Sequence, residues 1–147
     1  MTNQANTILS RLLDITTAFE DHTVGFIDSF ETKELLSFSD TDEKRKKFLR
    51  AYNDFSIKIN KYVEKYETNI NELSLLMCKA DRSHDAALTK KLSVEFDRYS
   101  LLFKAIKKFI TSCESLNLKK DPNANKSTVI KYAGELLVAL DNYKKNF

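Results

Sequence analysis

The chain has 147 residues, of which 42% are hydrophobic and 31% are charged, and these proportions are typical of one globular domain and exclude a disordered segment. Two glycines and one proline argue against sheets joined by tight turns and against a glycine-rich phosphate-binding loop. The 24 basic and 21 acidic residues leave a formal net charge of +3, which is too balanced to indicate a nucleic-acid-binding protein by itself.

The N-terminal residues have no positive charge and are not followed by an apolar run, so we predict no signal peptide. The longest uninterrupted apolar run covers residues 136–140, far short of the ~20 residues that a transmembrane helix needs. We therefore expect no transmembrane segment and a cytoplasmic protein.

The first predicted helix covers about residues 5–37, because apolar residues recur there at intervals of three or four. Its inward residues are Ile8, Leu12, Ile15, Phe19, Phe26 and Phe30. His22 falls on the same face, and we expect a hydrogen-bonded residue at the edge of the core in preference to a ligand or an acid–base group. The pattern continues through Gly25, which favours one continuous helix; a break into two helices at residues 23–25 is the alternative.

The second predicted helix covers about residues 41–81 and follows a helix-start pattern of short polar and acidic side chains at residues 39–43. Its apolar face is the longest in the chain. The residues on that face are Phe48, Tyr52, Phe55, Ile59, Tyr62, Tyr66, Ile70, Leu73, Met77 and Ala80. At ~1.5 Å per residue such a helix is about 60 Å long.

A short turn precedes the third predicted helix, which covers about residues 84–116. We predict Ser83 as its N-cap, and interpret Asp81, His84 and Asp85 as capping or solvated residues rather than as metal ligands, because nothing nearby completes a ligand set. The inward residues of this helix are Leu88, Leu92, Phe96, Tyr99, Phe103, Ile106, Ile110 and Cys113.

Residues 117–127 include the only proline and predict a loop, after which Ser127 or Thr128 caps a fourth helix of about residues 128–145. We expect Gly134 to mark a close approach of another helix. The inward residues of the fourth helix are Ile130, Ala133, Leu137 and Leu140, together with Leu136 and Tyr143.

Short connections between long helices predict an all-α, up-down-up-down antiparallel bundle in one domain, with three long helices and a shorter C-terminal one. Folding back near residue 82 places Cys113 level with Ala51, ~40 Å along the second helix from Cys78. A disulfide needs Cα atoms within ~7 Å, so we predict two free, inertly packed thiols.

Site chemistry is sparse in this sequence. There are two histidines, and neither follows a glutamate by three residues, as the di-metal centres of helical bundles require. We expect no cofactor, no metal site and no catalytic residues. An enzyme that relies on Asp, Glu, Lys and Tyr alone is only the third hypothesis for function.

Two surface features suggest a function. The fourth helix is too short to cover the far half of the bundle, so an apolar groove is predicted there unless three helices close over it. The residues predicted to line this groove are Ile8, Leu12, Ile15, Tyr66, Leu73, Met77, Leu88 and Leu92.

The second feature is a group of basic residues at the opposite end of the bundle. These include Lys44, Arg45, Lys46, Lys47, Arg50, Lys119 and Lys120.

From the groove we expect a non-enzymatic protein-interaction module, such as an adaptor, chaperone, inhibitor or immunity-type protein, that binds a partner protein or a second copy of itself. The alternative is a binder of anionic surfaces, either nucleic acid or acidic lipid headgroups, through the basic end. Salt dependence distinguishes the two, because only phosphate binding weakens steeply with added salt.

Overall fold

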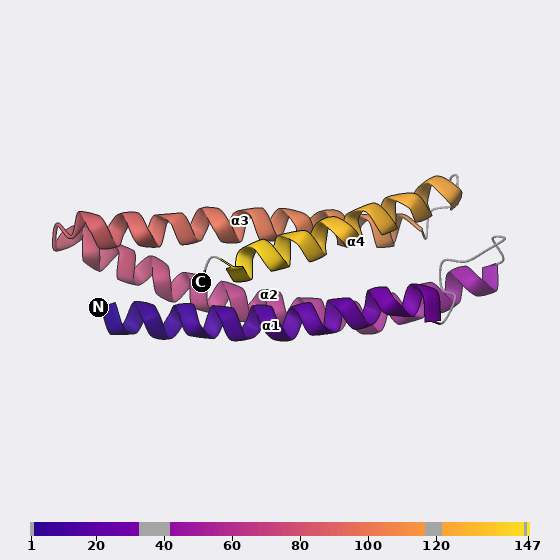
Figure 1. The fold of residues 1–147 in the computed structure, drawn as a ribbon, viewed down its shortest axis with the longest axis horizontal. Coiled ribbons are helices and arrows are strands. Elements are labelled where there is room, and N and C mark those ends of the chain that lie inside the picture. Colours follow the sequence, from indigo (N-terminus) through magenta and orange to yellow (C-terminus); the bar gives the residue numbers. More distant parts are fainter. Residues whose placement is uncertain (1, 33–41, 117–121, 146) are drawn as a thin grey trace.

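The computed structural model describes residues 2–32, 42–116, 122–145 and 147, with the side chains of residues 2, 31, 32, 42, 44, 45 and 122–125 excepted. These residues form four helices and no strand: α1 (Thr2–Thr32), α2 (Asp42–Arg82), α3 (Ala86–Ser115) and α4 (Pro122–Lys145). Successive helices run in alternating directions along one long axis (Figure 1). The most extensive contacts join α1 to α2, α2 to α3, α3 to α4 and α4 to α1. The predicted all-α bundle is confirmed.

Helix α1 is continuous through Gly25, as predicted, and the break into two helices does not occur. Residues 33–37, which the prediction added to its end, lie outside the described residues. Two buried polar residues, Thr16 and Thr23, donate their hydroxyls to the carbonyl oxygens of the residues four positions earlier, both at 2.7 Å. This bond satisfies a hydroxyl inside a helix, so threonine is tolerated on the buried face.

One end of the core is aromatic. Phe26 of α1 lies against Phe55 of α2 with ring centroids 4.6 Å apart, and Phe48 and Phe109 follow at 6.0 and 6.1 Å. Aromatic rings at these separations contribute packing beyond their buried area. The cluster therefore joins α1, α2 and α3 at the end where α4 begins.

The turn between α2 and α3 corrects the predicted N-cap. Asp85, and not Ser83, caps α3, because its carboxylate accepts a hydrogen bond from the amide of Leu88 at 3.1 Å. The Ser83 amide instead donates to the carbonyl of Lys79 in the last turn of α2. His84 has a φ of 58°, in the left-handed region, and this reverses the chain between the two helices.

Helix α4 begins at Pro122, earlier than the predicted start at residue 128. Proline suits the first position of a helix, since the amide it lacks would have no helical partner there. Ile130, predicted to face inward, is 57% exposed, while Val129 is fully buried. Gly134 is exposed, and a Cβ at this position would meet no atom within 4 Å, so the predicted close approach is wrong within the chain.

Helix α3 also differs from its predicted face. Leu102 and Phe109 are buried, whereas Phe96, Phe103 and Ile110 are only half-buried. The cysteines are free, as predicted. Cys113 is buried, and burial raises the pKa of its thiol. Cys78 is exposed, so the prediction of inert packing is wrong for this residue.

Candidate functional site

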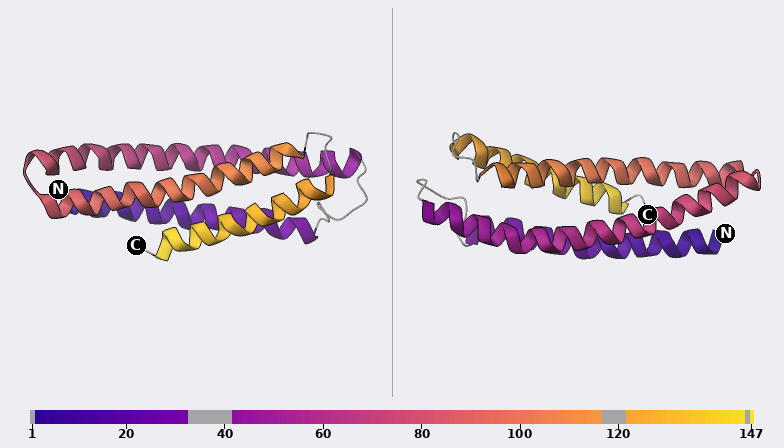
Figure 2. Two further views of the ribbon diagram at one scale, coloured as in Figure 1. Left: turned by 90° about the horizontal axis from the view of Figure 1, so that it is seen from above. Right: turned by 180° about the vertical axis from the view of Figure 1, so that it is seen from behind.

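The residues predicted to line an open groove pack inside the bundle. Six of them are buried, namely Ile8, Leu12, Tyr66, Leu73, Leu88 and Leu92. Ile15 and Met77 are half-buried against the same core. Helix α4 does stop short of the α2–α3 turn (Figure 2), but beyond its end α2 packs against both α1 and α3. No open groove therefore forms at these eight positions.

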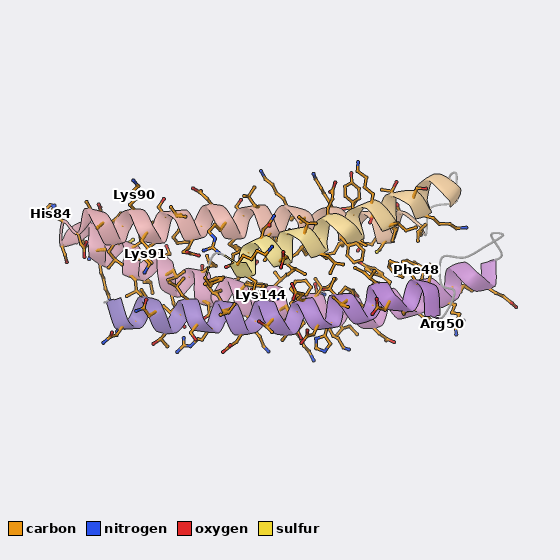
Figure 3. All side chains as sticks on the ribbon, in the orientation of Figure 1. Phe48, Arg50, His84, Lys90, Lys91 and Lys144 are labelled. Atoms are coloured by element: carbon orange, nitrogen blue, oxygen red, sulfur yellow. The ribbon has the colours of Figure 1, made fainter. Side chains whose placement is uncertain are left out.

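The predicted basic end is only partly described. Lys46, Lys47 and Arg50 are exposed near the start of α2, and Figure 3 shows Arg50 at that end of the bundle. The side chains of Lys44 and Arg45 lie outside the described residues. The same is true of Lys119 and Lys120. The convergence of cations from α2, α3 and α4 is thus not established by the described residues.

The turn between α2 and α3 does not build a metal site. Asp81, His84 and Asp85 are exposed and line the same shallow surface cavity, but Asp85 is engaged as the cap of α3. Within residues 2–32, 42–116 and 122–145, no three His, Cys, Asp or Glu side chains converge as metal ligands. The capping interpretation of this turn therefore agrees with the structure.

His22 forms the hydrogen bond that was predicted for it. Its Nδ1 atom is bonded to the hydroxyl of Tyr62, and the two rings lie 5.6 Å apart between centroids. The histidine is exposed and sits at the edge of the core. His22 therefore has a structural role, because its hydrogen bond joins α1 to α2.

Sequence reasoning missed a buried ion pair in the middle of the bundle. Arg98 donates to both carboxylate oxygens of Glu95, at 2.7 and 2.9 Å, and to the main-chain carbonyl of Tyr143 at 2.6 Å. The two side chains are only 14% and 9% exposed. The guanidinium also lies over the rings of Tyr143 and Phe147, at 5.2 and 4.7 Å. Arg98 thus fastens the C-terminal end of α4 to α3.

A second contact holds the same end of α4 to α1. The ammonium of Lys144 lies 2.6 Å from a carboxylate oxygen of Glu20, and this hydrogen bond raises the pKa of Lys144 (Figure 3).

Glu95 and Arg98 are three residues apart, a spacing that usually indicates a solvated pair on a helix surface. The Glu95–Arg98 pair is buried because α4 packs beside it, and the sequence alone does not give the position of α4.

A cluster of three tyrosines reaches the Glu95–Arg98 pair through Tyr143, whose ring lies under the Arg98 guanidinium. Tyr66 shares a 2.8 Å hydrogen bond with Thr16, and its ring lies 5.3 Å from Tyr99 and 6.0 Å from Tyr143. Burial raises the pKa of Tyr66 well above its usual value and that of Tyr99 to about 12. These phenols stay protonated at neutral pH, so the tyrosines contribute polar groups but no additional charge.

Helices α3 and α4 each carry an aliphatic side chain that is largely exposed. Leu101 is 68% exposed and Val138 is 60% exposed. Leu101 lines a cavity of about 160 Å³ together with Ala139, the residue after Val138. The remaining lining residues are Arg98, Leu102, Asn142 and Tyr143. We call this cavity, together with the exposed side chain of Val138 next to Ala139 in the sequence, the α3–α4 furrow.

Comparison with known proteins gives no further lead: no family model, no curated protein and no solved structure matches the chain. None of the four helices, as far as they are described, is both long enough and apolar enough to cross a membrane. The candidate site therefore rests on the geometry of the bundle alone.

Proposed function

We propose that this chain is a non-enzymatic protein-interaction module, and that its partner docks on the α3–α4 furrow. The observation behind the proposal is the exposure of Leu101 in the lining of an existing cavity, with exposed Val138 next to the lining residue Ala139. Single exposed aliphatic residues are ordinary on protein surfaces. Two of them beside a cavity form the kind of surface that receives an apolar side chain from an amphipathic helix.

We propose the furrow in place of the groove that the sequence predicts, because Leu101 is exposed whereas six of the eight predicted groove residues are buried. Arg98 and Tyr143 line the inner side of the cavity, and both are held by the contacts between α3 and α4. A partner would meet a preformed surface on two fixed helices, which lowers the entropy cost of binding.

The test compares three variants in capture experiments from native lysate. Leu101→Asp and Val138→Asp place a charge in the furrow, whereas Ile57→Asp is a matched control at a 57% exposed position on α2. All three should fold, as judged by helical circular dichroism and by the unfolding midpoint. We expect a captured protein to be lost with both furrow variants and retained with the control. Equal capture by all three variants would contradict the furrow.

The exposure of Lys46, Lys47 and Arg50 supports a second candidate, binding of anionic surfaces at the start of α2. Sedimentation with vesicles that contain an anionic phospholipid, at low and high salt, tests it. Binding that falls steeply with salt and is lost on changing these three residues to glutamine supports this candidate. Binding of neither vesicles nor nucleic acid at low salt would contradict it.

A further inference from the structure

Beyond its cavity, the α3–α4 furrow continues into a group of exposed lysines. Lys104 and Lys108 follow Leu101 on α3 by three and seven residues, so the three side chains lie on one side of that helix. All three are exposed. On the other helix, Tyr132 precedes the cavity residue Ala139 by seven residues, or about two turns, and therefore lies on the same side of α4.

The ring of Tyr132 is the point where lysines from both helices meet. The Nζ atom of Lys108 lies 5.9 Å from the centroid of this ring, and the Nζ atom of Lys131 lies 5.4 Å from the same centroid. Contact with an aromatic face attracts an ammonium group but does not neutralise it. Within the described residues, Lys104, Lys108 and Lys131 form no ion pair. We call these three residues the furrow lysines.

Carboxylates are few around the furrow lysines. Residues 99–113 of α3 contain three lysines and no acidic residue, and the facing residues 128–140 of α4 contain one lysine and one acid, Glu135. Glu135 can offset only one of these four lysines. Exposed Asp97 lies one turn before Leu101, on the side away from the lysines. The furrow is therefore apolar at the Leu101 end and positively charged at the Tyr132 end.

We propose that the partner segment that docks on the furrow is an acidic amphipathic helix, whose apolar anchor contacts Leu101 and whose carboxylates face the furrow lysines. This inference rests on the proposed function and names the chemistry of its partner. At ~1.5 Å per residue, Lys104 and Lys108 lie about 4.5 and 10.5 Å beyond Leu101 along α3. A partner helix that follows the furrow therefore needs acidic residues three or four and seven positions from its anchor.

The apolar end of the furrow favours a protein helix over a phosphate backbone. A nucleic acid would be bound by the lysines alone, and its binding would not depend on Leu101. A polyanion that covered the whole furrow would also meet the negative charge of Asp97 beside Leu101. An amphipathic helix uses both ends, because its apolar residue and its carboxylates lie on one face.

The first test is a selection from displayed helical peptides. Each peptide has ~20 residues, long enough to form a helix alone, with one central leucine and random residues three, four and seven positions to either side of it. Peptides that bind the wild type are kept, and those that also bind Leu101→Asp are removed. We expect Asp and Glu to be enriched among the random positions on one side of the leucine.

The second test measures the affinity of one selected acidic peptide, made synthetically. The double variant Lys104→Glu/Lys108→Glu should bind it at least about tenfold more weakly, and a peptide with lysines in place of its acids should recover part of the loss. Lys90→Glu is the matched control. Lys90 is exposed on α3 near the α2–α3 turn (Figure 3), ~16 Å from Leu101 and beyond the ~8 Å screening length, so this variant should bind like the wild type.

The outcomes separate this inference from the proposed function. Peptides that depend on Leu101 but show no acidic enrichment would overturn the inference and leave the furrow as a docking site. Unchanged binding of the acidic peptide by Lys104→Glu/Lys108→Glu would do the same. The absence of any peptide that depends on Leu101 would overturn both proposals. Single-stranded nucleic acid or anionic vesicles that bind through Lys104 and Lys108, with no effect of Leu101→Asp, would show a phosphate ligand and also overturn the inference.

Discussion

The buried pair between Glu95 and Arg98 gives the sharpest prediction for stability. Arg98→Met keeps most of the side-chain volume but removes three charge-assisted hydrogen bonds of 2.6 to 2.9 Å. It leaves the carboxylate of Glu95, a residue only 6% exposed, without its partner. Breaking a buried pair from one side costs ~3–5 kcal/mol, a large part of the ~5–15 kcal/mol that stabilises a typical domain.

Replacing both partners separates the cost of an orphaned charge from the value of the pair. The double variant Glu95→Leu/Arg98→Met has no buried charge left, and we expect its free energy of unfolding to return to within about 1–2 kcal/mol of the wild type. Urea unfolding, followed by helical circular dichroism, measures all the free energies in this cycle.

The matched control for this prediction is the surface pair of Arg11 and Glu72, whose side chains are 52% and 45% exposed. Arg11→Met should cost no more than ~1 kcal/mol, since water replaces the lost contact. If Arg98→Met is as mild as Arg11→Met, the pair is not buried in solution, and Arg98 does not hold the end of α4.

Three further predictions concern burial. A thiol reagent should modify Cys78 rapidly in the folded protein and Cys113 only on unfolding, because Cys113 is buried and the pKa of its thiol is raised; equal rates would contradict this. Burial raises the pKa of Tyr99 from 10.0 to about 12, so its stabilising contribution is complete below pH ~10 and is lost as the pH rises through about 12. Unfolding measured against alkaline pH, with tyrosinate absorbance, should show that loss. Leu73→Ala should cost ~2–5 kcal/mol in denaturant unfolding, against under ~0.5 kcal/mol for Leu75→Ala at a 66% exposed position.

The helices could be predicted because their apolar residues repeat over many turns. Helix α2 was expected at about residues 41–81 and runs from Asp42 to Arg82. The continuity of α1 through Gly25 was predictable for the same reason, since several apolar turns on each side outweigh one glycine. The start of α4 was missed because its first two turns contain no large apolar residue, and periodicity cannot mark a helix there.

The candidate site was less predictable, because a single helix face does not reveal how many neighbours a helix has. Whether helices α1 to α3 close beyond the end of α4 depends on their separation and tilt. The sequence predicted an open groove unless three helices closed over it, and the structure buries six of the eight groove residues. The exposure of Leu101 likewise depends on where α4 lies beside α3.

Helix α3 shows this limit most clearly. It carries two adjacent apolar stripes, one through Phe96, Phe103 and Ile110 and the other through Leu102 and Phe109. The first is the more aromatic and so suggests the core, yet it is only half-buried. The second is buried, because α3 packs against both α2 and α4 and its innermost line falls between those two contacts. The first stripe lies toward α2 alone, so its side chains stay partly exposed to solvent. The same geometry buries Glu95, which lies two turns before Leu102 along the innermost line, and a buried carboxylate there needs the guanidinium of Arg98. The ion pair is thus a consequence of packing α3 between two helices, and pattern analysis of α3 alone could not have found it.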